Sequence, residues 1–341
     1  MIQQNRLVIA VKMNTIDRER NVWVPDPEIV FMFSGQGSHY FQMGRELFEK
    51  NDTFHNWMVR LDDIPRQLSG KSVVEVLYSD LHGKADPFDR TLLTHPAIFM
   101  VEYSLAETLI EAGVYPDMVM GVSLGSFAAA TVAGFIEVQD ALSAVVRQAI
   151  AFEECCEPGG MTAVLADPAL FADELFRGRC ELAAINFSSH FVVSAKYAEL
   201  AQIEAALDRR NIGYQRLPVS YPFHSQWIDN AKTPFESFMR SIPGKDGRLP
   251  LACCYHATIL SGLSDGYFWN VARRPILFRE TTARLEQQGP RRYIDVGPAG
   301  TLATFLKYTM PSNTRSAAHA ILTPFGFDQK NLAAILAAIR N

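Results

Sequence analysis

The stretch MVMGVSLGSFAAATVA at residues 118–133 decides the fold. Its first residues are apolar and typical of a buried strand, and the small residues after Gly125 can form a closely packed helix. Between them, GVSLG at 121–125 matches G-x-S-x-G, a pattern that places a serine on a sharp turn from strand to helix. Ser123 is therefore predicted to be an exposed nucleophile. The alternative is an ordinary Gly-Ser turn, since a short pattern also occurs by chance.

Strands and helices alternate on both sides of this stretch. The apolar run at 28–33 ends in SGQG at 34–37 and predicts a second buried strand that enters a tight turn. Helices are predicted at 40–50 and 96–113. This alternation is typical of a mostly parallel sheet with helices on both faces.

The pattern changes between residues 158 and 220. Strands are predicted at 161–165, 182–185, 191–194 and 213–219, and helices at 168–177 and 198–210. This βαββαβ order is typical of a ferredoxin-like module. We therefore expect an α/β protein with an α/β-hydrolase-like large domain (28–157 and 221–322) and an inserted ferredoxin-like small domain (158–220). Residues 1–27 would form an N-terminal extension, and residues 323–341 a C-terminal helix.

Composition excludes several classes of function. The net charge is −5, which does not favour general binding of nucleic acid or of an anionic membrane. No run reaches the roughly 18 apolar residues of a transmembrane helix. The five cysteines form no CxxC pair, so we expect no metal site and no disulfide framework, and their odd number fits the cytoplasm. The glycines at 34–37 lack the lysine of a nucleotide-binding loop.

A serine nucleophile needs a general base, and two histidines are candidates. His224 lies in YPFHS at 221–225, where the chain returns from the predicted small domain. His319 would instead complete the order Ser123, Asp295, His319, which is the chain order of an α/β-hydrolase triad. Spacing alone does not choose between them.

Several motifs together resemble a known family. SGQG at 34–37, GVSLG at 121–125, FHS at 223–225 and DVGP at 295–298 occur in the order and approximate spacing of malonyl-CoA:acyl carrier protein transacylases. The chain also resembles acyltransferase domains of polyketide synthases, from about residue 28 to 306. The resemblance implies that Ser123 accepts the acyl group and that His224 is its base. It also implies an oxyanion hole formed by the N–H groups of Gln36 and Leu124, and a main-chain carbonyl near 276–277 that orients the base.

The sequence departs from this family in the predicted acyl pocket. The family usually has histidine where this chain has Val122, glutamate where it has Ser126, and glutamine where it has His95. Loss of the histidine at 122 should make the pocket more apolar. Asn186 and Phe223 are also implied to line it, and Phe223 resembles the residue found in malonyl-type enzymes.

The most informative departure is at Gln148. Counted back from Met161, this position corresponds to the arginine that binds the malonyl carboxylate in the family. A buried carboxylate needs a fixed guanidinium, and a neutral amide cannot supply that charge. The pocket is therefore expected to take acetyl or longer uncharged acyl groups. Arg147 would point about 100° away on a helix, although a slip of one residue would restore the arginine.

Glutamine at this position resembles discrete acyl hydrolases associated with trans-acyltransferase polyketide synthases. We therefore expect a cytoplasmic serine enzyme that hydrolyses acyl thioesters from the acyl carrier protein of a polyketide synthase. Acyl-CoA is a further candidate partner. The substrate would carry phosphopantetheine, and no further cofactor is expected. Arg273, Arg274 and Arg279 are candidates for a basic docking patch, or simply part of a solvated face. The alternatives are a malonyl-CoA or other acyl transacylase and an inactive docking module.

Overall fold

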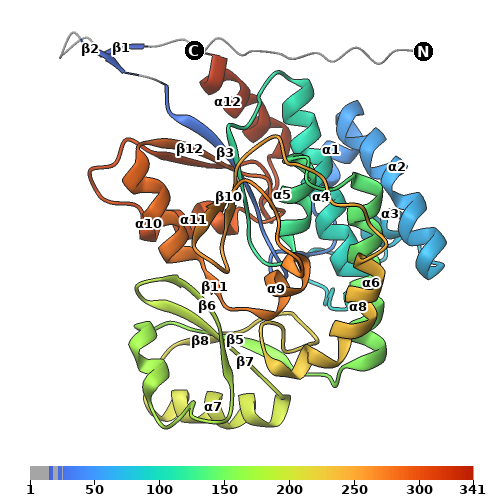
Figure 1. Cartoon of the computed structure of the whole chain (residues 1–341), viewed down its shortest axis with the longest axis vertical. Coiled ribbons are helices and arrows are strands. Elements are labelled where there is room, and N and C mark those ends of the chain that lie inside the picture. The colour runs from blue at the N-terminus through green and yellow to red at the C-terminus, as the bar shows by residue number, and fades with distance from the viewer. Residues whose placement is uncertain (1–14, 18–21, 25, 341) are drawn as a thin grey trace.

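A six-stranded sheet forms the centre of the larger part of the molecule (Figure 1). The computed structural model describes residues 15–17, 22–24 and 26–340. The strand order is β10-β9-β4-β3-β12-β13, and neighbours are parallel except for β10 and β9. The strands are β3 (Glu28–Phe33), β4 (Met118–Gly121), β9 (Leu251–Cys253), β10 (Thr258–Leu260), β12 (Arg291–Asp295) and β13 (Ala317–Ala320).

Both faces of this sheet are buried because its central strands are apolar from Val30 to Phe33 and from Met118 to Gly121. Along β3, Phe31 and Phe33 pack into one hydrophobic cluster, whereas Val30 and Met32 pack into another. This alternation follows from the two-residue period of a strand. The sheet is thereby covered on both sides, as a largely parallel sheet requires.

Helices contribute side chains to both clusters. The cluster on the Val30 face includes residues of α10 (Phe278–Gln288) and α11 (Thr301–Thr309). The cluster on the Phe31 face draws on α1 (Arg45–Lys50), α2 (Asp52–Ser69), α3 (Val73–Leu77), α4 (Thr91–Glu111), α5 (Gly125–Val132), α6 (Val138–Cys155), the 3₁₀ helix η2 (Gln226–Ala231), α8 (Lys232–Met239), α9 (Tyr267–Arg273) and α12 (Asp328–Arg340). Among the described residues, no helix is both long and apolar enough to cross a lipid bilayer.

A second sheet forms the smaller part of the molecule, at the bottom of Figure 1. Its strand order is β11-β6-β7-β5-β8, and the order β6-β7-β5-β8 with antiparallel pairing is that of a ferredoxin-like sheet. The elements are β5 (Gly160–Val164), β6 (Glu181–Phe187), β7 (His190–Ala195), α7 (Tyr197–Arg209), β8 (Tyr214–Arg216) and β11 (Ile276–Leu277). The strand β11 comes from the later segment of the large domain and pairs in parallel with β6.

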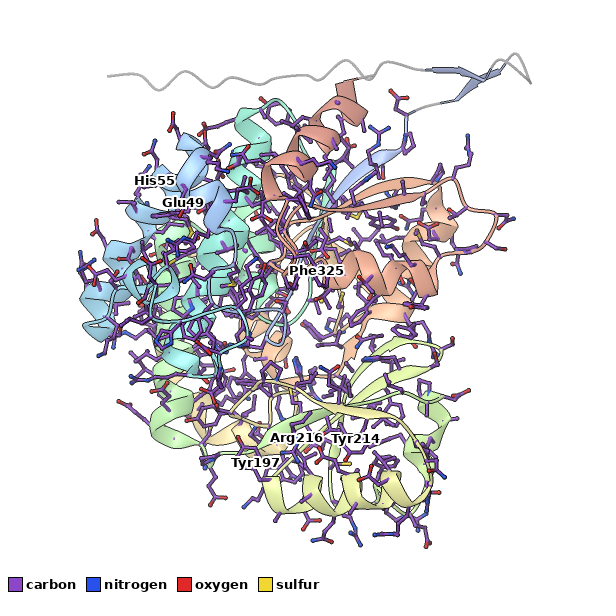
Figure 2. The ribbon with its side chains drawn as sticks, turned by 180° about the vertical axis from the view of Figure 1, so that it is seen from behind. Glu49, His55, Tyr197, Tyr214, Arg216 and Phe325 are labelled. Atoms are coloured by element: carbon purple, nitrogen blue, oxygen red, sulfur yellow. The ribbon has the colours of Figure 1, made fainter. Side chains whose placement is uncertain are left out.

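An ion pair joins the sheet of the small part to its helix. Arg216 on β8 forms two hydrogen bonds to the carboxylate of Glu204 on α7, at 2.6 and 2.7 Å. The Arg216 guanidinium also lies 5.7 Å from the ring centre of Tyr197. Figure 2 shows Arg216 beside Tyr197 and Tyr214 in this part of the molecule.

Two predicted helices differ from those observed. The helix predicted at 168–177 is only the 3₁₀ turn η1 (Pro168–Ala172), because the Asp173 carboxylate accepts a hydrogen bond from the N–H of Leu175 and competes with helix formation. The helix predicted at 40–50 begins only at Arg45, because Gln42 and Gly44 have positive φ angles. Most of the predicted N-terminal extension lies outside the described residues; β1 (Thr15–Asp17) and β2 (Val22–Val24) pair antiparallel within it.

Candidate active site

Ser123 lies on a sharp turn between β4 and α5. Its φ angle is +52°, a left-handed conformation that is strained for serine. The turn also requires glycine on either side of it. A Cβ atom at Gly125 would lie 2.3 Å from the carbonyl oxygens of Phe33 and Ser34, and one at Gly121 would lie 2.5 Å from Cα of Ser126. The close approach of strand, turn and helix therefore depends on these two glycines and positions the serine hydroxyl.

His224 is the histidine that contacts the nucleophile. Its Nε2 lies 2.8 Å from Oγ of Ser123, and its Nδ1 lies 2.7 Å from the carbonyl oxygen of Arg274. Because a carbonyl can only accept, Nδ1 carries the proton, and Nε2 is left to accept the serine hydroxyl proton. The sequence predicted that the orienting carbonyl lies near 276–277, whereas the structure places it at Arg274. Residues 276–277 form β11, whose backbone pairs with β6.

Burial keeps the imidazole of His224 neutral, which is the form that can accept a proton. The side chain is buried, and this desolvation lowers its pKa from 6.5 to about 4; the Arg274 carbonyl partly opposes the shift, and the charge of Arg273 adds to it. His224 is consequently neutral near pH 7. A neutral imidazole at hydrogen-bond distance from a serine hydroxyl is the arrangement that general-base catalysis requires.

Two main-chain N–H groups beside the serine are free to bind an oxyanion. Gln36 and Leu124 both line the cavity that contains Ser123. Within the described part of the chain, neither N–H has a hydrogen-bond acceptor. The side chain of Gln36 is held separately, by a hydrogen bond of 2.7 Å from its Nε2 to Oγ1 of Thr94. The two N–H groups can therefore stabilise negative charge on a carbonyl oxygen attacked by Ser123.

A buried glutamate fixes the loop that carries Gln36. Oε1 of Glu102 accepts hydrogen bonds from the N–H and the hydroxyl of Ser34, at 2.6 and 2.8 Å. Ser38 donates to the carbonyl of Gly35 at 2.8 Å. Burial raises the pKa of Glu102 well above its usual range, and the hydrogen bonds from Ser34 partly oppose this shift. Sequence reasoning missed this residue, because nothing in the helical pattern around it distinguishes it from a surface glutamate.

A small cavity continues from Ser123 into the large domain. Its free space is about 10 Å³, roughly enough for one water molecule. The lining residues are mostly apolar or aromatic: Gln36, His95, Ser123, Leu124, Phe127, Gln148, Phe152, Phe223, Val271 and Ala272. Of the residues assigned to the acyl pocket from sequence, Gln148, His95 and Phe223 lie here. Phe127, Phe152, Val271 and Ala272 were missed, although Phe152 lies one helical turn after Gln148 and shares its face.

Gln148 rather than Arg147 faces this cavity. Gln148 is 2% exposed, whereas Arg147 is exposed and its guanidinium lies 5.9 Å from the ring centre of Phe238. The two side chains leave helix α6 in different directions, as adjacent helical residues must. None of the described residues that line the cavity is lysine or arginine.

Two residues predicted to line the pocket lie elsewhere. Val122 packs with Met118 and Met120 in the hydrophobic cluster on the far face of the sheet, because it follows their two-residue period. Asn186 lies on β6 of the small part, where its Nδ2 is 3.1 Å from Nδ1 of His190. Neither residue lines the cavity at Ser123.

The alternative triad is not assembled. Asp295 ends β12, and its carboxylate accepts hydrogen bonds from the N–H groups of Gly297 and Ala303, both at 2.9 Å. Its role is therefore to hold the start of α11. His319 lies on β13, in register with Ile294, while the base position beside Ser123 is occupied by His224.

The arginines of the predicted docking patch differ in their surroundings. Arg273 forms ion pairs with Glu181 and Asp229, at 3.0 and 2.8 Å, and Arg279 pairs with Glu280 at 2.9 Å. Arg274 is exposed. A larger cavity, of about 540 Å³, lies between α8 and α9, and neither Ser123 nor His224 lines it.

The fold and the Ser–His pair define an enzyme of the acyltransferase class. The chain matches the model of the acyl transferase domain family over residues 30–340, and it belongs to this family. It is 42% identical, over 306 residues, to the polyketide biosynthesis acyltransferase homolog PksD of Bacillus subtilis (strain 168), with 89% of this chain and 94% of that protein covered. The homolog BaeD of Bacillus velezensis is also 42% identical, over 305 residues, with 89% and 94% covered.

Solved structures of the same family have the same fold. A loading acyltransferase from the avermectin modular polyketide synthase superimposes with a TM-score of 0.82 at 26% identity, over 92% of this chain and 100% of that one. The malonyl-CoA:acyl carrier protein transacylase of Xanthomonas oryzae gives a TM-score of 0.79 at 21% identity, over 92% and 98%. The second likeness supports the fold alone.

Proposed function

We propose that this enzyme removes acyl groups from the acyl carrier protein of a polyketide synthase by hydrolysing the thioester. The observation that carries the proposal is Gln148, a neutral, buried side chain in the same cavity as the nucleophile. In the family that the chain resembles, this position carries the arginine that binds the malonyl carboxylate. The names of the relatives PksD and BaeD support a role in polyketide biosynthesis.

Electrostatics disfavour a malonyl substrate. A carboxylate placed in this cavity would lose its hydration and meet an amide rather than a guanidinium. Leaving a buried charge without a partner costs about 3–5 kcal/mol. An uncharged acyl group avoids this cost and gains from contact with Phe152 and Phe223, which line the same space.

The reaction proceeds in two halves. His224 Nε2 takes the proton of the Ser123 hydroxyl while Oγ attacks the thioester carbonyl, and the oxyanion binds the N–H groups of Gln36 and Leu124. The C–S bond breaks, and the phosphopantetheine thiol leaves with the proton from His224. Water then attacks the carbonyl carbon of acyl-Ser123 and gives one proton to His224; the bond between that carbon and Oγ breaks, and Oγ takes the proton back from His224. The products are the carboxylic acid, the free thiol and the regenerated serine.

The competing function is transfer of the acyl group to a second thiol. Both functions share acyl-Ser123 and differ in whether a thiol or water reacts with it. Phe223 favours the transferase, because the resemblance places phenylalanine here in malonyl-type enzymes. The relatives PksD and BaeD are themselves named acyltransferase homologs.

Intact mass spectrometry of carrier proteins distinguishes the two functions. The enzyme is incubated with acetyl- and malonyl-loaded carrier protein, and separately with malonyl-CoA and unloaded carrier protein. We expect loss of acetyl to water, with malonyl largely retained. In Gln148→Arg the preference should shift toward malonyl. Efficient transfer of malonyl from coenzyme A onto the unloaded carrier protein by the wild type would overturn the proposal.

A further inference from the structure

Among the described residues, two polar side chains that line the cavity at Ser123 have buried nitrogen atoms without a hydrogen-bond partner. Within the described part of the chain, both ring nitrogens of His95 and Nε2 of Gln148 are buried and unpaired. His95 is 3% exposed and Gln148 is 2% exposed. Both line the cavity that contains Ser123. Because buried polar groups in proteins are almost always paired, two unpaired ones on the same cavity point to a ligand that pairs them.

The surroundings hold the His95 ring in place and keep it neutral. Its ring centre lies 6.0 Å from that of Phe152, edge to face, and 5.5 Å from that of Phe223. Burial, together with a smaller contribution from the nearby His39, lowers the pKa of His95 to about 3. The ring therefore presents one N–H donor and one lone pair, and Gln148 adds N–H donors in the same cavity.

We propose that His95 and Gln148 form a subsite for an oxygen atom on the acyl chain, and that the enzyme therefore prefers acyl groups carrying an uncharged hydroxyl or keto group. The inference rests on the proposed function and specifies its substrate. A hydroxyl accepts a hydrogen bond from Gln148 Nε2 and donates one to the unprotonated nitrogen of His95. A keto oxygen accepts from both side chains.

The size of the cavity strengthens this preference. Its free space of about 10 Å³ matches one water molecule, so a longer chain enters only when lining side chains rotate. An oxygenated chain offsets the free-energy cost of this rearrangement, because its oxygen forms hydrogen bonds with His95 and Gln148. A hydrocarbon chain displaces water from them and leaves them unpaired. Sites built to hydrogen-bond a substrate hydroxyl discriminate strongly against analogues that lack it.

Matched acyl groups on the same carrier protein test the subsite. The wild-type enzyme is given carrier protein loaded with butyryl, 3-hydroxybutyryl or 3-oxobutyryl, and both acyl-Ser123 formation and release of free acid are followed by intact mass. We expect kcat/KM to be at least about tenfold higher for the oxygenated groups, since one net hydrogen bond is worth about that factor. Equal rates, or a preference for butyryl, would overturn the subsite.

Variants connect the preference to the two residues. Gln148→Leu and His95→Phe remove the hydrogen-bonding groups at similar size, and each should reduce the ratio of kcat/KM for 3-hydroxybutyryl to kcat/KM for butyryl. Gln139→Leu and His256→Phe make the same changes at exposed positions and should keep the wild-type ratio. A preference that persists undiminished in both cavity variants would also overturn the inference.

The two proposals can fail independently. Acyl-Ser123 that forms without subsequent release to water contradicts the hydrolase, yet its rate of formation from each acyl group still reports on the subsite. Hydrolysis of all three groups at similar rates supports the hydrolase and rejects the subsite.

Discussion

The lowered pKa of His224 predicts an unusual pH dependence. In the free enzyme this pKa is about 4, because burial disfavours the imidazolium. The base is neutral, and active, above that value. We expect kcat/KM to be nearly constant from pH 8 to about pH 5 and to fall only below that. A histidine with an ordinary pKa of 6.5 would instead lose roughly thirtyfold between pH 7.5 and 5.

Two histidine variants serve as controls for this profile. His224→Ala should lose about 10²–10⁴ in kcat at every pH, the usual contribution of a general base. His319→Ala should retain both the activity and the shape of the profile, because Asp295 is engaged with Gly297 and Ala303. The opposite result at the two histidines would restore the alternative triad.

Glu102 is predicted to act through the loop that carries Gln36. Glu102→Gln keeps an oxygen that can accept from the N–H and hydroxyl of Ser34, and it should keep most of the activity. Glu102→Leu leaves the N–H of Ser34 buried and unpaired, at a cost of about 1–3 kcal/mol, whereas the Ser34 hydroxyl still has Oγ of Ser38 at 3.0 Å. We expect kcat to fall about 10- to 100-fold in Glu102→Leu with a smaller change in KM, measured by steady-state kinetics. Equal kcat values in the two variants would contradict this role.

At the scale of elements, the contact of α5 with β3 leaves no room for a side chain at Gly125. Gly125→Ala would place a methyl group 2.3 Å from the carbonyl oxygens of Phe33 and Ser34. The helix must then move away, which displaces Ser123 and the N–H of Leu124. We expect a loss of about 1–3 kcal/mol in the free energy of unfolding, measured in urea, together with a large loss of kcat. In Gly83→Ala the added methyl meets no atom within 4 Å, and stability should be unchanged.

Whether a feature of the site depends on local sequence or on the path of the backbone explains whether it could be predicted. The apolar strand, the glycines and the small-residue helix determine the turn at Ser123 locally, so the pattern at 118–133 was sufficient to predict it. The acceptor for His224 is a main-chain carbonyl, which any residue has, and only the path of the backbone selects Arg274. The resemblance implies a pocket position for Val122, but the two-residue period that it shares with Met118 and Met120 places it in the cluster on the other face of the sheet.

For the whole molecule, the distribution of charge predicts which arginine would contact the carrier protein that we propose as the partner. Arg273 is already paired with Glu181 and Asp229, whereas Arg274 is exposed next to the site. Arg274→Ala should raise KM for the carrier protein several-fold at low salt, and the difference should shrink as salt screens the charges. Its main-chain carbonyl, and hence the orientation of His224, is retained. The measurement is KM at two ionic strengths.

Arg273→Ala is the matched comparison. Its ion pairs are partly exposed, so their loss should cost only about 0.2–1 kcal/mol in the free energy of unfolding. We expect little effect of salt on the change in KM for this variant. A larger electrostatic effect at Arg273 than at Arg274 would show that the carrier protein approaches from another side.

The strand β11 has a practical consequence for building hybrid enzymes. It belongs to the segment after α9 but completes the edge of the small sheet beside β6, and it begins two residues after the carbonyl that orients His224. A hybrid that exchanges only 160–216 between relatives would pair a foreign β6 with the native β11. The exchanged unit should therefore include 274–277, so that the edge strand and the partner of the catalytic base come from the same parent.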